Sequence, residues 1–179
     1  KDGKIFDFTE YLKALIDPLV FAPKVIDISH HEIHEGNSFY LTDVSVLDTA
    51  GVQNYLLEIP DSDVRIHFGY ETITNGIFTI ELFEATDKFG SVEETFLNRD
   101  RNSLTTSLAK FYKGITGGTT DGVRILHWAG GAVQGNSRTA VGSGGGLERI
   151  LKKGTKYILR ITSGSTATTF STRFDFYQE

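Results

Sequence analysis

Three histidines near the start of the chain are the residues whose types and spacing most suggest metal chemistry. His30, His31 and His34 surround Glu32, and imidazole with carboxylate is a common ligand combination for zinc. We predict an extended strand over residues 26–34. On such a strand His30 and His34 point to one face but lie about 13 Å apart, too far to share an ion. The sequence therefore predicts no metal site, and favours histidines that form hydrogen bonds or subunit contacts.

A second charged motif, residues 98–103, places Arg99 and Arg101 on either side of Asp100. Two guanidinium groups could bind an anion such as a phosphate or a sugar acid. The flanking asparagines are more typical of a turn whose aspartate accepts hydrogen bonds from backbone and guanidinium groups. We expect this structural role first, with a contact to another subunit as the main alternative and anion binding as the minor one.

Other segments that could carry chemistry lack part of their pattern. The glycine run at residues 142–146 is not followed by the Lys-Ser/Thr pair of a phosphate-binding loop. The serines lie outside a Gly-x-Ser-x-Gly nucleophile turn. Trp128 follows His127 like a sugar-stacking pair, but a lone tryptophan at a strand end is more often an anchor in a core or an interface. The sequence therefore predicts no catalytic residue and no cofactor.

The elements that must position these residues are mostly β-strands. A period of two is clear at residues 64–70, 156–161 and 168–176, and in the last segment Arg173 and Asp175 take the face opposite the phenylalanines. Further strands are expected at residues 40–47, 55–59, 77–85, 105–111, 123–128 and 147–152. We expect residues 77–83 to form a central strand covered on both sides. The pattern predicts an all-β chain, an antiparallel β-sandwich of jelly-roll type whose core is filled by thirteen phenylalanines and seven tyrosines.

The first 25 residues follow a different period. Residues 8–16 place Phe8, Leu12, Leu15 and Ile16 on one helical face, and Pro18 ends the pattern. A helix this short is not stable alone in water, so its apolar face must pack against something. Both docking on its own domain and reaching a neighbouring subunit remain open. We divide the chain into an N-terminal helical arm, residues 1–25, and a sandwich domain, residues 26–179.

A glycine-rich stretch at residues 129–146, which contains Arg138, interrupts the strands. A loop of this length inside a compact domain is usually functional or disordered. We weigh a solvated surface loop against a loop that becomes ordered on a neighbouring subunit, where glycines let two backbones approach closely.

Composition excludes several partners. The net charge is −5, whereas a protein that binds nucleic acid normally presents a basic face. The chain has no cysteine, so it forms neither disulfides nor thiolate metal sites. No apolar run approaches the roughly 20 residues that cross a membrane, and acidic residues interrupt the N-terminus in a way that a signal peptide does not tolerate. We expect a soluble protein that binds neither nucleic acid nor membrane.

Four phrases carry a resemblance: HHEIHEGNSFY from His30, LNRDRNS from Leu97, GGGLERILKKGTKYILRI from Gly144, and the closing FDFYQE. In this order and spacing they resemble a family of tailed-phage head-decoration, or auxiliary capsid, proteins. The resemblance covers residues 28–179, and its recurring parts fall at residues 31–36, 98–103 and 148–157.

The resemblance implies a jelly-roll virion protein, made in the host cytoplasm, that stabilises the phage head from outside. Its implied partners are the major capsid protein and two further copies of itself, with no cofactor and no catalytic residues. The alternatives are a tail or fibre component, a carbohydrate-binding module with a glycan ligand, or an enzyme. We expect the capsid or subunit interface to involve Phe8, Leu12, Leu15, Ile16, Val20, Phe21, Arg99, Asp100, Arg101, Trp128 and Arg138.

Overall fold

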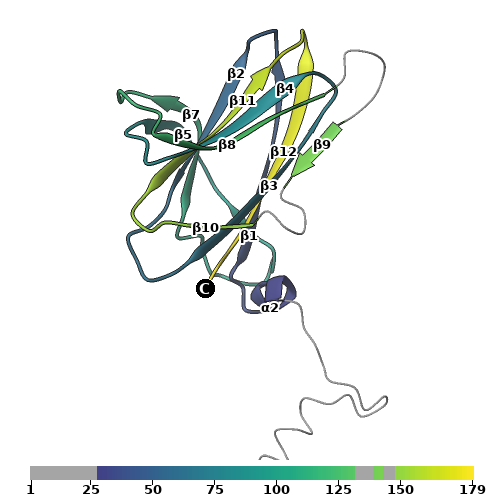
Figure 1. Cartoon of the computed structure of the whole chain (residues 1–179). Helices are drawn as coiled ribbons and strands as arrows, with labels where there is room; N and C mark the ends of the chain where they lie inside the picture. Colours follow the sequence, from purple (N-terminus) through teal and green to yellow (C-terminus); the bar gives the residue numbers. More distant parts are fainter. Residues whose placement is uncertain (1–27, 132–138, 143–147) are drawn as a thin grey trace, which may run out of the picture.

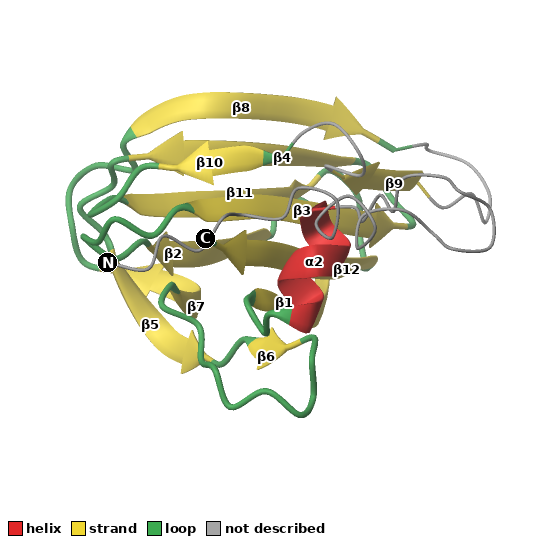
Figure 2. Ribbon diagram, turned by 90° about the horizontal axis from the view of Figure 1, so that it is seen from below, coloured by secondary structure: helices red, strands yellow, loops and turns green. Residues whose placement is uncertain are grey.

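The computed structural model describes residues 28–131, 139–142 and 148–179. In this part of the chain one short helix, α2 (Ile28–His34), lies at the end of two β-sheets that face each other (Figures 1 and 2). The predicted all-β antiparallel sandwich is confirmed. The expected helix at residues 8–16 lies outside the described residues. So do several expected interface residues, namely Phe8, Leu12, Leu15, Ile16, Val20, Phe21 and Arg138.

The strands follow the chain at short intervals. They are β1 (Ser38–Leu47), β2 (Val52–Glu58), β3 (Ile66–Thr74), β4 (Phe78–Glu84), β5 (Phe89–Glu94), β6 (Leu97–Asn98), β7 (Lys110–Thr116), β8 (Val123–Gly130), β9 (Thr139–Gly142), β10 (Arg149–Leu151), β11 (Lys156–Ser163) and β12 (Thr168–Gln178).

The strand pairs are nested within one another along the chain. β1 pairs with β12, β2 with β11, β3 with both β9 and β10, and β4 with β8, all antiparallel. The chain therefore forms one long antiparallel ribbon that turns back between β4 and β8. The ribbon wraps so that β12 also pairs with β3 and β11 with β4, which divides it between two sheets. This nesting is the jelly-roll arrangement that the sequence predicts (Figure 1).

An insertion at the point where the ribbon turns back extends both sheets. β7 and β5 continue one sheet beyond β2, in the order β5-β7-β2-β11-β4-β8. The short β6 pairs with β1 at the edge of the other sheet, whose order is β10-β3-β12-β1-β6. Because β6 ends at Asn98, the insertion brings the arginine motif beside β1.

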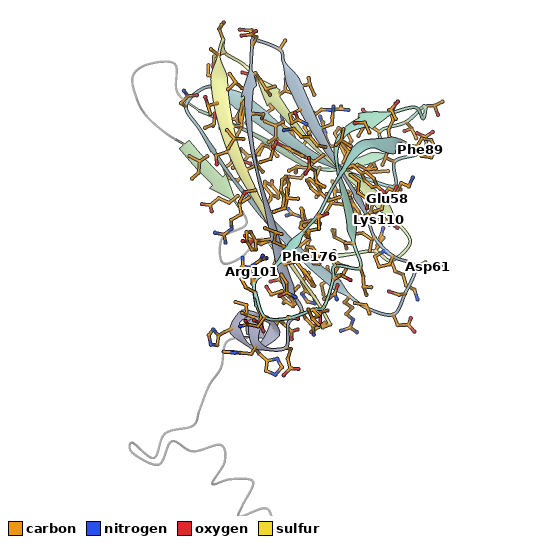
Figure 3. The ribbon with its side chains drawn as sticks, turned by 180° about the vertical axis from the view of Figure 1, so that it is seen from behind. Glu58, Asp61, Phe89, Arg101, Lys110 and Phe176 are labelled. Carbon is orange, nitrogen blue, oxygen red and sulfur yellow. The ribbon has the colours of Figure 1, made fainter. Side chains whose placement is uncertain are left out.

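Aromatic rings fill the space between the sheets. The ring centroid of Phe174 lies 4.6 Å from that of Phe111 and 4.9 Å from that of Tyr55, and Phe176 stacks on Phe39 at 5.0 Å. None of these five side chains is more than 3% exposed. Figure 3 shows Phe176 between the two sheets. Burial of each such ring stabilises the fold by roughly 2 to 3 kcal/mol, so these side chains make up much of the core that the sequence predicts.

The strand predicted at residues 26–34 is wrong, because Ile28–His34 form helix α2. The helix is capped after His34 by Gly36, which adopts a left-handed conformation with φ of +74°. The Gly36 N–H donates to Ile33 O at 3.1 Å and the Asn37 N–H to Glu32 O at 2.8 Å, the paired bonds of a Schellman cap. The glycine two residues after His34 is the signal in the sequence that favours a helix here. The neighbouring isoleucines alternate as they do in a strand, and this led to the wrong prediction.

Three further expectations need correction. β7 begins at Lys110, so the strand predicted at residues 105–111 starts too early. β4 is covered on its outer side only in part, since Phe78 and Ile80 are fully buried toward the core and Phe83 is buried on the outer side, but Glu81 there is only partly buried. β5 was not predicted at all, because its side chains are mostly exposed and only weakly alternating.

Candidate functional site

The sheet that contains β1, β12 and β3 turns one side to the core and the other to solvent. Alternation along β1 leaves Thr42, Val44 and Val46 exposed on the outer side. The prediction that Arg173 and Asp175 lie opposite the phenylalanines of β12 is confirmed. We call this surface the β1–β12–β3 face. It carries Tyr40, Thr42, Val44 and Val46 of β1, Thr169, Ser171, Arg173 and Asp175 of β12, and Glu71 and Ile73 of β3.

A pocket of about 350 Å³ lies where the insertion meets this face. We call it the arginine pocket. Its lining consists of Tyr40, Thr42, Arg99, Arg101, Arg173 and Asp175. Three guanidinium groups face one carboxylate there, which leaves an excess of two positive charges. The pocket can therefore accept a further carboxylate, phosphate or sulfate group.

Asp175 organises the arginine pocket. Its Oδ1 accepts a hydrogen bond from Arg99 Nη2, and its Oδ2 accepts one from Arg173 Nε at 2.6 Å. Both pairs are partly exposed. Arg101 takes part in neither of them and its side chain is exposed. The first two guanidinium groups are thus held in place by the fold, and Arg101 is the group most available to an incoming anion.

The turn that presents the arginines is held by its own hydrogen bonds. The Arg99 N–H donates to Ser38 O at 2.8 Å, which fixes the turn to the start of β1. The buried Asn98 amide donates to Gly36 O at 2.7 Å, and its Oδ1 accepts from the Asp100 N–H at 2.9 Å. These bonds tie the insertion, α2 and β1 together.

The described interface candidates separate into two places. Arg99 and Arg101 line the arginine pocket, while Asp100 accepts from the Asn102 N–H at 2.9 Å and so serves the predicted turn. The expected guanidinium partner of Asp100 is not found, because Arg99 pairs with Asp175 instead. Trp128 lies on β8, at the edge of the other sheet, and is 44% exposed. It therefore does not belong to the pocket.

An apolar strip continues from the arginine pocket along the β1–β12–β3 face. Val44 is 63% exposed, Val46 64% and Ile73 40%. In register, Ser171 lies between Val44 and Ile73, so the strip crosses all three strands. A hollow of about 250 Å³ adjoins it, lined by Ile73, Thr74, Asn75, Thr169 and Ser171. Exposed β-branched side chains beside a charged pocket are typical of a surface that meets another protein.

A third group of polar side chains closes the end of the same sheet. His67 Nδ1 lies 2.5 Å from Glu148 Oε1, and its Nε2 lies 3.1 Å from Glu179 Oε1. Tyr177 stacks on the His67 ring at 4.3 Å and donates its hydroxyl proton to Glu148 at 2.8 Å. Burial, followed by this hydrogen bond, raises the pKa of Tyr177. The cluster joins β3, β12 and the segment before β10, and its groups satisfy one another.

The sequence reasoning missed Arg173, Asp175 and Tyr40 as members of the site. Arg99 and Asp175 are separated by 76 residues, and they meet only because β6 and β12 flank β1 on opposite sides. The signal for these two β12 residues was available in the sequence, because Arg173 and Asp175 alternate with phenylalanines and so share the side of the strand opposite to the core.

Within the described ranges, no group of three or more His, Cys, Asp or Glu side chains is arranged to hold a metal ion. No helix in the same ranges is long and apolar enough to span a membrane. Comparison of the chain with protein-family models, curated proteins and solved structures gives no match.

Proposed function

We propose that this protein is a virion structural protein that decorates and stabilises the head of a tailed phage, as a trimer, by binding the major capsid protein. The observation that carries the proposal is the β1–β12–β3 face, where an arginine pocket with two excess positive charges adjoins an exposed β-branched strip. The four sequence phrases that resemble head-decoration proteins are the reason for proposing a phage head as the location.

The face suits protein contact in two complementary ways. Val44, Val46 and Ile73 offer apolar area whose removal from water contributes about 25 cal/mol per Å². The arginine pocket adds orientation, because a guanidinium fork binds a carboxylate with defined geometry. We therefore expect the capsid partner to present one or more acidic side chains opposite the pocket.

A rigid body is also what this role requires. A protein that stiffens a capsid must bind across the contacts between neighbouring capsid subunits. Because symmetry repeats each of these contacts many times, weak binding at one contact adds up over the whole shell. The aromatic core and the long β1–β12 pairing hold the face in one arrangement, with ten residues of each strand in register. The arm at residues 1–25 is proposed to extend the contact to a neighbouring subunit, and it lies outside the described residues.

Co-sedimentation with mature, expanded heads of the phage that encodes the protein tests the proposal. Full-length protein is expected to bind saturably, and a variant without residues 1–23 is expected to stay folded and bind much more weakly. Folded full-length protein that remains in the supernatant would overturn the decoration role. Equal binding by the truncated variant would overturn only the role of the arm.

A second candidate, binding of an acidic glycan, is favoured by Tyr40 beside the three arginines. The most exposed aromatics of the other sheet do not favour a broader glycan platform. Phe89, on β5, and Trp128, on β8, lie at opposite edges of that sheet. Titration with glucuronic acid and with glucose distinguishes the candidates. Saturable binding of the acid alone, with no binding to heads, would favour the glycan role.

A further inference from the structure

Helix α2 brings together two histidines that a strand would have held apart. His30 and His34 are one helical turn apart, and their Nε2 atoms are separated by 3.0 Å. Their ring centroids lie 4.6 Å apart at an interplanar angle of 81°. Both side chains are exposed, at the end of the sandwich where α2 contacts β1 and β12 (Figure 2). A strand over residues 26–34 would hold the two rings about 13 Å apart, whereas the helix brings them together.

The two ring nitrogens have the separation of neighbouring ligands on one ion. With metal–nitrogen bonds of about 2.0 to 2.1 Å, a separation of 3.0 Å corresponds to a ligand–metal–ligand angle of roughly 94°. An angle near 90° is that of adjacent positions in a square-planar or octahedral ion, whereas tetrahedral zinc requires a wider one. The geometry therefore favours Cu²⁺ or Ni²⁺ over Zn²⁺.

We propose that His30 and His34 form a two-histidine site for a late first-row divalent metal ion, with Cu²⁺ bound most tightly. In the absence of metal, one ring donates its Nε2 proton to the other. When both rings carry their proton on Nδ1 instead, the two Nε2 lone pairs converge on a single ion. Water, or a donor from another molecule, completes the coordination.

The neighbouring His31 supplies a matched control. It lies on the same helix and is also exposed, but its Nδ1 lies 3.4 Å from Glu32 Oε1 and its Nε2 lies 4.0 Å from Glu35 Oε1. It thus faces carboxylates and not the other two histidines. No third His, Cys, Asp or Glu within the described ranges joins the pair, so the described residues supply two ligands.

Isothermal titration of the untagged full-length protein with CuCl₂, NiCl₂ and ZnCl₂ tests the proposal. We expect one site that prefers Cu²⁺, and at least about tenfold weaker Cu²⁺ binding in both His30→Gln and His34→Gln. His31→Gln is expected to bind within about twofold of the unmodified protein. Binding should weaken as the solution is acidified, because protons compete with the metal for the same nitrogens.

Electron paramagnetic resonance of the Cu²⁺ complex adds an independent readout. The spectrum should show two equivalent imidazole nitrogens in the unmodified protein and one in His34→Gln. Far-ultraviolet circular dichroism checks that each variant keeps the fold. The proposal is overturned if the unmodified protein binds no Cu²⁺, or if His31→Gln weakens binding as much as His30→Gln.

Discussion

The outer sides of the two sheets differ in how far they satisfy their own charges. On the sheet of β2, β11 and β4, which we call the β2–β11–β4 face, Glu58 pairs with Lys156 at 3.1 Å and Glu81 with Arg124 at 2.7 Å. Arg160 donates to Asp121 at 2.8 Å. In the arginine pocket of the β1–β12–β3 face, Arg99 and Arg173 share Asp175, and Arg101 pairs with neither of its carboxylate oxygens.

Apolar side chains show the same contrast. The β2–β11–β4 face buries a small outer cluster in which Leu56 and Ile158 are fully covered and Phe83 is 9% exposed. The guanidinium of Arg160 lies over the Phe83 ring at 5.0 Å from its centroid. On the β1–β12–β3 face the corresponding side chains, such as Val44 and Val46, are more than half exposed. The centre of the β2–β11–β4 face is thus covered within the chain, although the edge strands of that sheet expose Phe89, Val123 and Trp128, whereas the centre of the β1–β12–β3 face is left uncovered.

The largest expected effect is on stability. Phe83→Ala removes the ring that covers the outer cluster and should lower the free energy of unfolding by about 3 kcal/mol. Val44→Ala, on the β1–β12–β3 face, should change it by less than about 0.5 kcal/mol, because Val44 is 63% exposed. Urea unfolding measures both. An equal loss of unfolding free energy in the two variants would contradict the claim that the two faces differ in how much apolar surface they bury.

A smaller effect concerns the ion pairs. Burial opposes ionisation of Glu81, but hydrogen bonds from Arg124 and His127 outweigh it and hold the pKa of Glu81 below its ordinary 4.5. Its stabilisation is therefore present above pH 4.5 and lost as the pH falls through the lower folded value. Glu81→Gln should cost about 1 kcal/mol at pH 7 and clearly less at pH 3.

Glu71→Gln is the matched control for this prediction. Glu71 is exposed on β3, in the sheet of the β1–β12–β3 face, and its loss should change the free energy of unfolding by less than about 0.5 kcal/mol at either pH. Urea unfolding at pH 7 and pH 3 measures both variants. If Glu71→Gln lowers the free energy of unfolding as much as Glu81→Gln does, the two faces do not differ in how strongly their carboxylates are paired.

The smallest expected effect is on the titration of a single carboxyl group, that of Asp87, and involves no large change in the free energy of unfolding. The carboxylate of Asp87 accepts hydrogen bonds from the backbone of Thr120 and from the backbone and hydroxyl of Thr119, which lower its pKa to about 2. Because this folded value lies below 3.8, the stabilisation is complete above about pH 3.8 and declines toward pH 2. Carboxyl chemical shifts followed by NMR should give a midpoint near 2. A midpoint near 3.8 would show that these loop contacts do not persist in solution.

The long strands could be predicted from the sequence because their alternation is strong. The alternation along β12 predicts both the strand and which of its sides faces the core. Its core side carries Phe170, Phe174 and Phe176, and its solvent side carries Arg173 and Asp175. The jelly roll followed from many short strands joined by turn residues, and the nested pairing confirms it.

The candidate site could be predicted only in part, for two physical reasons. Arg99 and Arg101 were recognisable as a motif, but their pocket depends on a register across β6, β1 and β12 that no local pattern contains. The His30–His34 pair depends on a seven-residue helix whose cap at Gly36 competes with the alternation of neighbouring isoleucines. Local periodicity identifies elements, whereas sites arise where distant elements meet.

The most direct test of the central claim compares one charge reversal on each face. Arg101, in the arginine pocket, and Lys110, on β7 of the other sheet, are both exposed and lie apart from each other (Figure 3). In co-sedimentation with phage heads, Arg101→Glu should weaken binding at least about tenfold, and Lys110→Glu should leave it within about twofold. Equal binding by the two variants, or a larger loss for Lys110→Glu, would contradict the assignment of the β1–β12–β3 face as the docking surface.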